Sequence, residues 1–283
     1  MRHKITAAVA AFLLVTVPAT AMAHIYRVAD GSFVPLQEVL QDLGEARLIF
    51  MGELHDNEGH HRAQLQIIRA LQEAGLPVAV GLEMVQRDDQ LALDAYVTGV
   101  WSEEQFLPVF FRNWSMWDKY QAIFRYARDQ KIPLVALNVS RNITQQVAQN
   151  GFASLSPEQI GELPAGIRCD ISPDYEAFIR RALGGHGHGG NKFVHFCEAQ
   201  MLWDSVMATE LLKYLEGNPD RVVVVLAGAG HSWKYGIPEQ VQRRRPLPMR
   251  ILLPEVPGRI EHDKVTVKEA DYIMLGLEEA PLH

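Results

Sequence analysis

Cysteine is nearly absent from this chain, with only Cys169 and Cys197 among 283 residues. Their separation excludes the CxxC spacing that zinc and redox sites use. In an oxidising compartment the two could form a disulfide, but Cys197 falls within a helical, partly apolar pattern, where a buried free thiol is the alternative. Because neither cysteine lies near the amino terminus, we expect no lipoprotein attachment site.

Basic charge is also scarce. The chain has 27 Lys and Arg against 34 Asp and Glu, which gives a formal charge of −7. Its one basic run, Arg243–Arg245, is short and typical of a solvated helix end. This balance argues against a nucleic acid or an anionic membrane as partner. With 48% hydrophobic residues, the chain can instead bury a substantial core, as one large domain or a domain with an insertion.

Long hydrophobic runs are missing except near the amino terminus. There, Arg2 and Lys4 precede an apolar run over residues 5–17, and the small-residue pattern Ala21–Ala23 follows. This order is typical of a secretory signal peptide, because the run is too short to span a bilayer comfortably. We expect cleavage after Ala23, so that residues 1–23 leave and residues 24–283 form a periplasmic or secreted protein. Losing Arg2 and Lys4 takes the formal charge to −9.

Short apolar runs bounded by polar residues, glycine or proline predict buried strands. They cover residues 48–51, 78–82, 133–137 and 222–226, with weaker candidates at 251–253 and 272–274. Helical patterns separate these runs, and strands that are apolar on both faces indicate a parallel sheet. The sequence therefore predicts an α/β fold, a parallel β-sheet flanked by helices. Additional helical patterns predict a smaller all-helical subdomain, with insertions around 86–130 and 150–215.

Polar side chains follow the predicted strands. Glu53 and His55 come after the first strand, Glu83 after the second, Asn138 after the third and His231 after the fourth. Ligands bind beyond the carboxyl ends of parallel strands, and residues two apart in extended chain face one side. We therefore expect Glu53, His55, Glu83 and His231 to meet in one cavity. The alternative is structural: His55 caps the next helix and Glu53 accepts backbone hydrogen bonds.

Four further positions carry polar groups in informative places. His61 shares the apolar face of the first predicted helix and is expected to point inward, whereas His60 is expected in solvent. Asp204 interrupts the apolar face of a helix over residues 193–215, so it needs a cation, an imidazole or several donors. His188 lies in the glycine-rich segment 184–190, either free to reach a ligand or part of an incidental metal-binding tract.

Five motifs occur together in order along the chain. They are Gly52-Glu53-Leu54-His55-Asp56-Asn57 with His61 and Gln64, Gly81-Leu82-Glu83-Met84, the segment from Ala199 to Ala208, Gly228-Ala229-Gly230-His231, and Gly236-Ile237-Pro238. This combination resembles the ChaN-like haem-binding uptake family, which belongs to a superfamily with the Tiki metalloproteases and the erythromycin esterases. The resemblance implies an exported, non-enzymatic protein of haem and iron uptake. It further implies ferric haem as the ligand, a homodimer on haem binding, and an outer-membrane haem receptor system as partner.

In this family a tyrosine binds the haem iron, and a histidine and a lysine lie near the propionates. A phenolate suits ferric iron, and cations suit carboxylates. On this resemblance Tyr235 is our first choice as axial ligand, with Tyr120 and Tyr175 as alternatives; Tyr235 could also be an ordinary half-buried aromatic. The candidates for propionate contacts are Lys234, Lys192 and His188.

The resemblance also leaves an enzymatic alternative open. In a metal-dependent hydrolase like those of the superfamily, Glu53 would serve as general base, and His55, Glu83 and His231 would surround a divalent metal ion or a water. Two imidazoles and carboxylates suit zinc, manganese or iron. Haem binding follows from the resemblance, whereas the strand-end residues considered alone favour hydrolysis.

Overall fold

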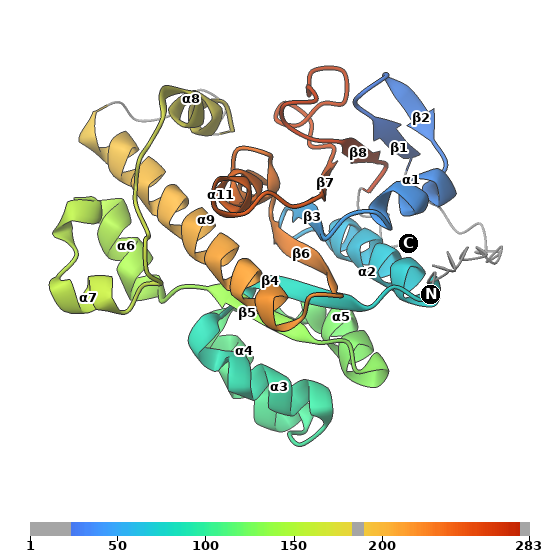
Figure 1. Cartoon of the computed structure of the whole chain (residues 1–283), viewed down its shortest axis with the longest axis horizontal. Coiled ribbons are helices and arrows are strands. Elements are labelled where there is room, and N and C mark those ends of the chain that lie inside the picture. Colours follow the sequence, from blue (N-terminus) through green and yellow to red (C-terminus); the bar gives the residue numbers. More distant parts are fainter. Residues whose placement is uncertain (1–23, 183–189, 278–283) are drawn as a thin grey trace, which may run out of the picture.

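The structure is a computed structural model that describes residues 24–182 and 190–277 (Figure 1). Eight strands form one sheet in the order β2-β1-β8-β7-β3-β6-β4-β5. Their bounds are β1 His24–Arg27, β2 Ser32–Val34, β3 Leu48–Glu53, β4 Val78–Gln86, β5 Leu134–Asn138, β6 Val222–Gly228, β7 Met249–Pro254 and β8 Tyr272–Leu275.

Six of these strands, from β8 to β5 across the sheet, run parallel to one another. They correspond to the six apolar runs of the sequence, so the predicted α/β fold is confirmed. The antiparallel hairpin of β1 and β2, which pairs with β8, was not predicted. Its strands have only four and three residues, too few to show a hydrophobic period.

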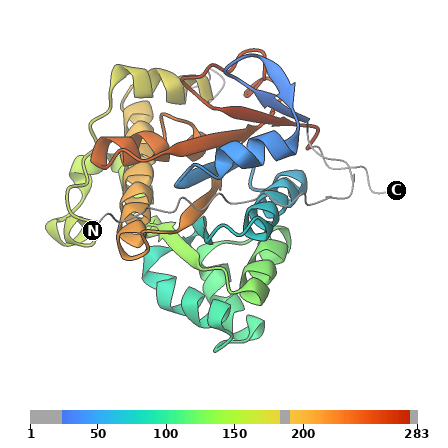
Figure 2. The same ribbon diagram turned by 45° about the vertical axis from the view of Figure 1, so that its right-hand side comes forward.

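Helices cover both faces of the sheet (Figures 1 and 2). Their bounds are α1 Leu36–Leu43, α2 Glu58–Glu73, α3 Gln90–Thr98, α4 Glu103–Asn113, α5 Trp117–Gln130, α6 Arg141–Asn150, α7 Pro157–Gly161, α8 Pro173–Ala182, α9 Asn191–Gly217, α10 Ala229–Ser232 and α11 Ile237–Arg244, with short 3₁₀ turns at Arg87–Asp89 and Phe152–Ser154. No helix in the described ranges is long and apolar enough to cross a membrane.

Alternate side chains of the buried strands point to opposite faces of the sheet and pack in two separate hydrophobic cores. In β3, Ile49 and Met51 pack in one core with α1, α2 and the α3–α5 segment, whereas Leu48 and Phe50 pack in the other with α8, α9 and α11. This alternation follows from the two-residue period of a strand. Burial on both faces holds the central strands, and therefore their carboxyl ends, in fixed positions.

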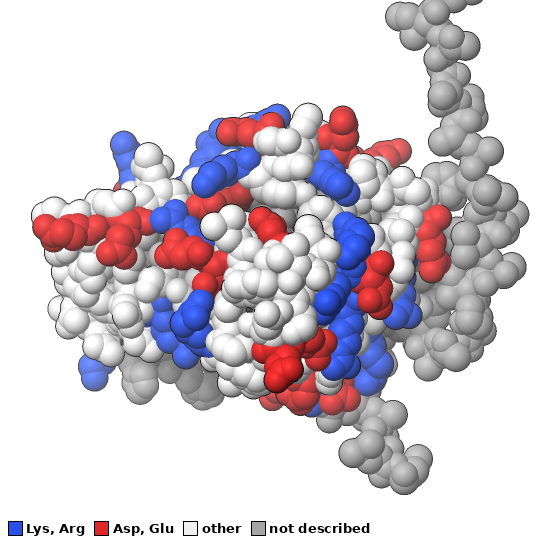
Figure 3. All heavy atoms as spheres, turned by 90° about the horizontal axis from the view of Figure 1, so that it is seen from below, with Lys and Arg blue, Asp and Glu red and all other residues white. Residues whose placement is uncertain are grey.

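The predicted helical insertions lie between consecutive strands. The segment between β4 and β5 carries α3–α5, and the segment between β5 and β6 carries α6–α9. A third, smaller apolar cluster joins α6 and the chain after it to α9, through residues such as Ile143, Val147 and Leu202. Acidic and basic side chains lie interspersed on the face seen in Figure 3. The predicted signal peptide, residues 1–23, is outside the described residues.

Candidate ligand site at the carboxyl ends of the strands

The structure brings together the strand-end residues that the sequence singled out. Glu53 ends β3 beside Gly228 of β6, and Glu83 lies in β4 next to Leu82, the last residue of its regular pairing with β6. Glu53, Glu83 and His231 are at most 7% exposed, and His55 is half-buried. Four ionisable groups from three strand ends therefore share one largely buried site.

Glu53 is enclosed by donors. Its carboxylate accepts hydrogen bonds from His55 Nδ1 (2.8 Å), Gln64 Nε2 (2.6 Å) and the hydroxyl of Tyr120, and His61 Nδ1 lies 3.5 Å away. Although burial alone would raise the pKa of Glu53, the hydrogen bonds and charges of the two histidines outweigh it and hold the pKa well below its usual range. Glu53 therefore stays ionised, and it orients His55 with Nε2 directed toward Glu83.

Asp204 of α9 orients the second imidazole in the same way. Its carboxylate is 2.7 Å from His231 Nδ1 and accepts a hydrogen bond of 2.8 Å from the Tyr175 hydroxyl. Burial disfavours a charge on His231, but the nearby Glu83 and Asp204 outweigh it and raise the pKa of His231 to about 9. The sequence analysis predicted that Asp204 needs a cation, an imidazole or several donors, and the structure provides an imidazole.

Glu83 lies between the two imidazoles. Its Oε1 is 3.9 Å from His55 Nε2 and 3.8 Å from His231 Nε2, while its Oε2 accepts a hydrogen bond of 2.7 Å from the Gly228 N–H. A Cβ at Gly228 would come within 3.0 Å of His55 Nε2, so the close packing here depends on glycine. The site thus consists of two carboxylate–imidazole pairs that face one carboxylate.

The structure excludes His55 as the helix cap and corrects the prediction for His60. Asn57 caps α2 through its side chain, which accepts from the His60 N–H. His60 is only 2% exposed, because its Nδ1 accepts the Leu54 N–H at 2.9 Å and the carboxyl-terminal segment packs over this turn. His61 is buried as expected. Contacts with a distant segment decided the position of His60, and no local pattern encodes them.

Two adjoining cavities open on this site and share His55, Gln200 and His231 in their walls. The first, which we call the apolar cleft, has a volume of about 590 Å³. It is lined by Leu54, Met116, Trp233, Val256, Arg259 and Ile260, among others. The second, which we call the amide chamber, has a volume of about 390 Å³, and its lining includes Glu83, Trp114 and Trp203. Both volumes suit small ligands.

Among the residues proposed to bind haem, Tyr235 is connected to the apolar cleft through aromatic contacts, whereas Lys234 is held by other groups. Tyr235 stacks on Phe178 with ring centroids 5.5 Å apart, and Phe178 packs at 5.4 Å against Trp233, which lines the cleft. Lys234 pairs instead with Asp271 at 2.5 Å and donates to the Val267 carbonyl. Lys192 is exposed on α9, and His188 lies outside the described residues.

Tyr120 and Tyr175, the alternative iron ligands, are fully buried and donate to Glu53 and Asp204. Burial and the neighbouring carboxylates raise the pKa of both phenols, so both remain neutral. Their role is to hold carboxylates, which the sequence did not show. Arg259 was also missed: it is exposed at the cleft, and no carboxylate of the described chain pairs with it. It belongs to no motif, so only the structure identifies it.

The geometry does not show a metal site. In residues 24–182 and 190–277, no group of three or more His, Cys, Asp or Glu side chains is arranged to hold a metal ion. The Nδ1 atoms of His55 and His231 are each within 2.8 Å of a carboxylate oxygen. The divalent metal on His55, Glu83 and His231 therefore stays a prediction. Cys169 and Cys197 are free thiols, not a disulfide.

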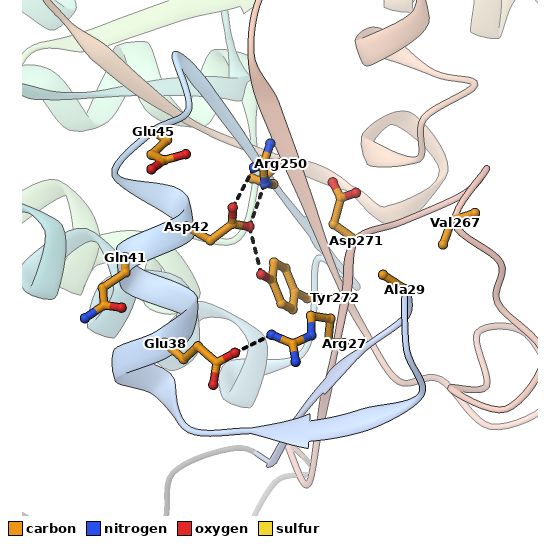
Figure 4. A pocket seen from close by; sticks show the side chains of 10 residues that line it. All are labelled: Arg27, Ala29, Glu38, Gln41, Asp42, Glu45, Arg250, Val267, Asp271 and Tyr272. Atoms are coloured by element: carbon orange, nitrogen blue, oxygen red, sulfur yellow. Dashed lines mark hydrogen bonds and ion pairs between the residues drawn. The ribbon is translucent and has the colours of Figure 1, made fainter.

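A third cavity, of about 480 Å³, lies at the opposite, amino-terminal ends of β7 and β8 (Figure 4). Most of its charged groups form ion pairs. Asp42 accepts two hydrogen bonds from Arg250, of 2.5 and 2.6 Å, and one of 2.8 Å from the Tyr272 hydroxyl, and Arg27 pairs with Glu38. These ion pairs join α1 to the sheet. The charged cluster therefore has a structural role and needs no ligand to explain it.

A protein-family model, described as haem-binding uptake, Tiki superfamily, ChaN, matches residues 39–241. The chain belongs to the ChaN haem-binding uptake family. The match spans the site described above, from α1 to α11, and includes Glu53, His55, Glu83 and His231. No curated protein matches the chain significantly.

A solved ChaN structure shares the fold of this chain. A structure titled "Cofacial heme binding to ChaN of Campylobacter jejuni" aligns with a TM-score of 0.69 and 19% identity, over 89% of this chain and 96% of that one. The erythromycin esterase EreC in its open conformation aligns with a TM-score of 0.49 and 16% identity, over 83% and 77%. The type III effector HopBA1 gives 0.48 and 13%, over 93% and 100%.

Proposed function

We propose that this ChaN-family protein is exported and takes part in haem uptake by binding ferric haem at the apolar cleft, with Tyr235 as the iron ligand. Family membership supports haem as the ligand. The observation that carries the proposal is the aromatic group Trp233–Phe178–Tyr235, which continues the lining of the cleft to a tyrosine. The apolar lining of the cleft suits the macrocycle of haem, and a phenol close to it suits ferric iron.

The charges around the cleft support a different propionate partner from the lysine first considered. Lys234 is held by Asp271, whereas Arg259 lies at the cleft without a carboxylate partner in the described chain. Arginine binds carboxylates in a bidentate manner. Arg259 is therefore our first choice for a propionate, with the exposed Lys192 and with His188 as further candidates. A homodimer on haem binding and delivery from an outer-membrane receptor belong to the same proposal.

Haemin titration of the mature protein, residues 24–283, tests the proposal directly. We expect a saturable shift of the Soret band, lost or changed in position in Tyr235→Phe, and weakened affinity in Arg259→Gln. The matched control is Tyr126→Phe on α5, whose hydroxyl bonds Gln72 and is not part of the cleft lining. A free-haemin spectrum with the unmodified protein would overturn the proposal. Light scattering of the same samples, with and without haemin, tests the dimer.

Hydrolysis is a second candidate, because two carboxylate–imidazole pairs converge on Glu83. Here Glu53 would be a poor base, because donors enclose its carboxylate and hold its pKa low, and the raised pKa of His231 makes that imidazole a proton donor rather than a base. With a divalent metal, such a site would activate a water. Mass-spectrometric metal analysis of the mature protein and of Glu83→Gln tests whether this hydrolase would use a metal. A bound metal that is lost in the variant supports the metal site. No bound metal in either protein rules out the metal-dependent mechanism.

A further inference from the structure

The amide chamber differs from the apolar cleft in the chemistry of its walls. Trp114 packs edge-on against His55 with ring centroids 4.9 Å apart, and Trp203 packs edge-on against His231 at 5.7 Å. Both indoles line the chamber, together with Glu83. The chamber therefore has two indole walls around a carboxylate, and each indole stands beside one imidazole.

Several polar groups of the chamber have spare hydrogen-bonding capacity. Arg141 makes a single long bond, of 3.4 Å, to the Asn113 carbonyl, and it has no ion pair with any described carboxylate. The side-chain amides of Gln86, Gln145 and Gln200 have no hydrogen-bond partner among residues 24–182 and 190–277. An arginine and three amides can together offer more donors and acceptors than this part of the chain uses.

In contrast, the neighbouring asparagine side chains in the same wall already use their amide N–H groups in hydrogen bonds within the protein. Asn113 donates to Asp89 and to the Val109 carbonyl, and Asn138 donates to the Glu83 carbonyl. These asparagines build the wall itself. The uncommitted glutamines and Arg141 are the groups left for a ligand.

The arrangement of charge selects the ligand class. Arg141 is exposed, whereas Glu83 is 6% exposed, and its Oε1 has no hydrogen-bond donor closer than the two imidazoles. A ligand carboxylate would pair with the guanidinium of Arg141, because Glu83 repels a second anion. Ligand hydroxyls can donate to Glu83 and exchange hydrogen bonds with the glutamine amides. The aliphatic C–H faces of such a ligand suit the negative faces of the indoles.

We propose that the amide chamber binds a hydroxylated carboxylate of the sugar-acid class, separately from the ligand of the apolar cleft. Haem does not meet this description, because its macrocycle is apolar and carries no hydroxyl. The proposal does not depend on haem binding, and it holds whether or not the site is catalytic.

Calorimetric titration of the mature protein with D-galacturonate, D-galactose and acetate tests this ligand class. We expect saturable binding of galacturonate, about tenfold tighter than that of galactose, since one charged hydrogen-bonded pair contributes about 1.5 kcal/mol. Acetate should bind more weakly still, because it lacks hydroxyls. Equal binding of galacturonate and galactose, or no saturable binding of galacturonate, would overturn the proposal.

Variants locate the site. Arg141→Gln should weaken galacturonate binding about tenfold and leave galactose binding unchanged. The matched control Arg62→Gln removes an arginine that is 60% exposed on α2 and should change neither. A loss in Arg259→Gln with none in Arg141→Gln would place the ligand in the apolar cleft and contradict the proposal. Haemin titration of Arg141→Gln should be unaffected, which separates this test from that of the haem site.

Discussion

Charged side chains gather at both ends of the parallel strands, but their surroundings differ. At the amino ends, Asp42 and Arg250 are each about 30% exposed, and a carboxylate meets a guanidinium directly. At the carboxyl ends, Asp204 is 1% exposed and meets His231, which is charged only when protonated. The amino-end pairs can form in water at little cost, whereas the carboxyl-end pairs must offset the free-energy cost of burying both groups.

This difference shows how the two ends divide stability and function. Arginine pairs at the amino ends hold α1 on the sheet over a wide range of pH. At the carboxyl ends, the His231–Asp204 pair loses its charge as pH rises through about 9, so its strength depends on pH in a range where an arginine pair does not change. The comparison predicts larger and differently pH-dependent effects from substitutions at the carboxyl ends.

The largest expected difference is between two aspartates. Asp204→Ala leaves the buried His231 Nδ1 and the Tyr175 hydroxyl without their acceptor, and should lower the free energy of unfolding by about 3–5 kcal/mol. Asp42→Ala removes a partly exposed pair and should lower it by about 1 kcal/mol. Urea unfolding followed by circular dichroism measures both. Equal losses would show that the two ends do not differ in this way.

Stability should also depend on pH in opposite directions at the two ends. The pKa of His231 rises from 6.5 to about 9 on folding, so its contribution, up to about 3 kcal/mol, is complete below pH 6.5 and lost as pH rises through 9. The Arg250 hydrogen bonds lower the pKa of Asp42, so that contribution is lost only as pH falls into the acidic range. Urea midpoints between pH 6 and 9 should fall, and His231→Gln should flatten this fall.

Two glycines provide a comparison of packing. A Cβ at Gly59, in the first turn of α2, would lie 1.7 Å from the Leu277 carbonyl oxygen, so Gly59→Ala should cost about 3 kcal/mol. At Gly44, after α1, the nearest atom would be 3.3 Å away and the backbone is already helical, so Gly44→Ala should change stability by less than about 0.5 kcal/mol. Thermal unfolding of both variants measures these changes in stability. A Gly59→Ala variant as stable as the unmodified protein would disprove the close packing at Gly59.

The smallest expected difference concerns tyrosine hydroxyls. Tyr175→Phe removes a donor to the buried Asp204 and should cost about 1.5 kcal/mol. Tyr272→Phe removes a donor to Asp42, which keeps two bonds from Arg250, and should cost about 0.5 kcal/mol. Chemical denaturation resolves this gap. A larger loss for Tyr272→Phe would reverse the comparison.

The sequence predicted the parts of this protein that depend on local pattern. The six strands appear in the sequence as short apolar runs, and the parallel arrangement follows from the helices between them. Glu53, His55, Glu83 and His231 could be chosen because each follows such a strand. The residues that position them could not, since Tyr120 and Tyr175 reach the site from inserted helices. His60 and Arg259 likewise depend on segments distant in sequence.

A register shift between β4 and β5 separates the pair Leu82–Ala136 from the pair Gln86–Asn138. Four residues of β4 therefore run alongside two of β5. In an unbroken strand, side chains three positions apart point to opposite faces, yet Glu83 and Gln86 both line the amide chamber. Deleting Met84 and Val85 should restore an ordinary ladder and turn Gln86 away from the chamber.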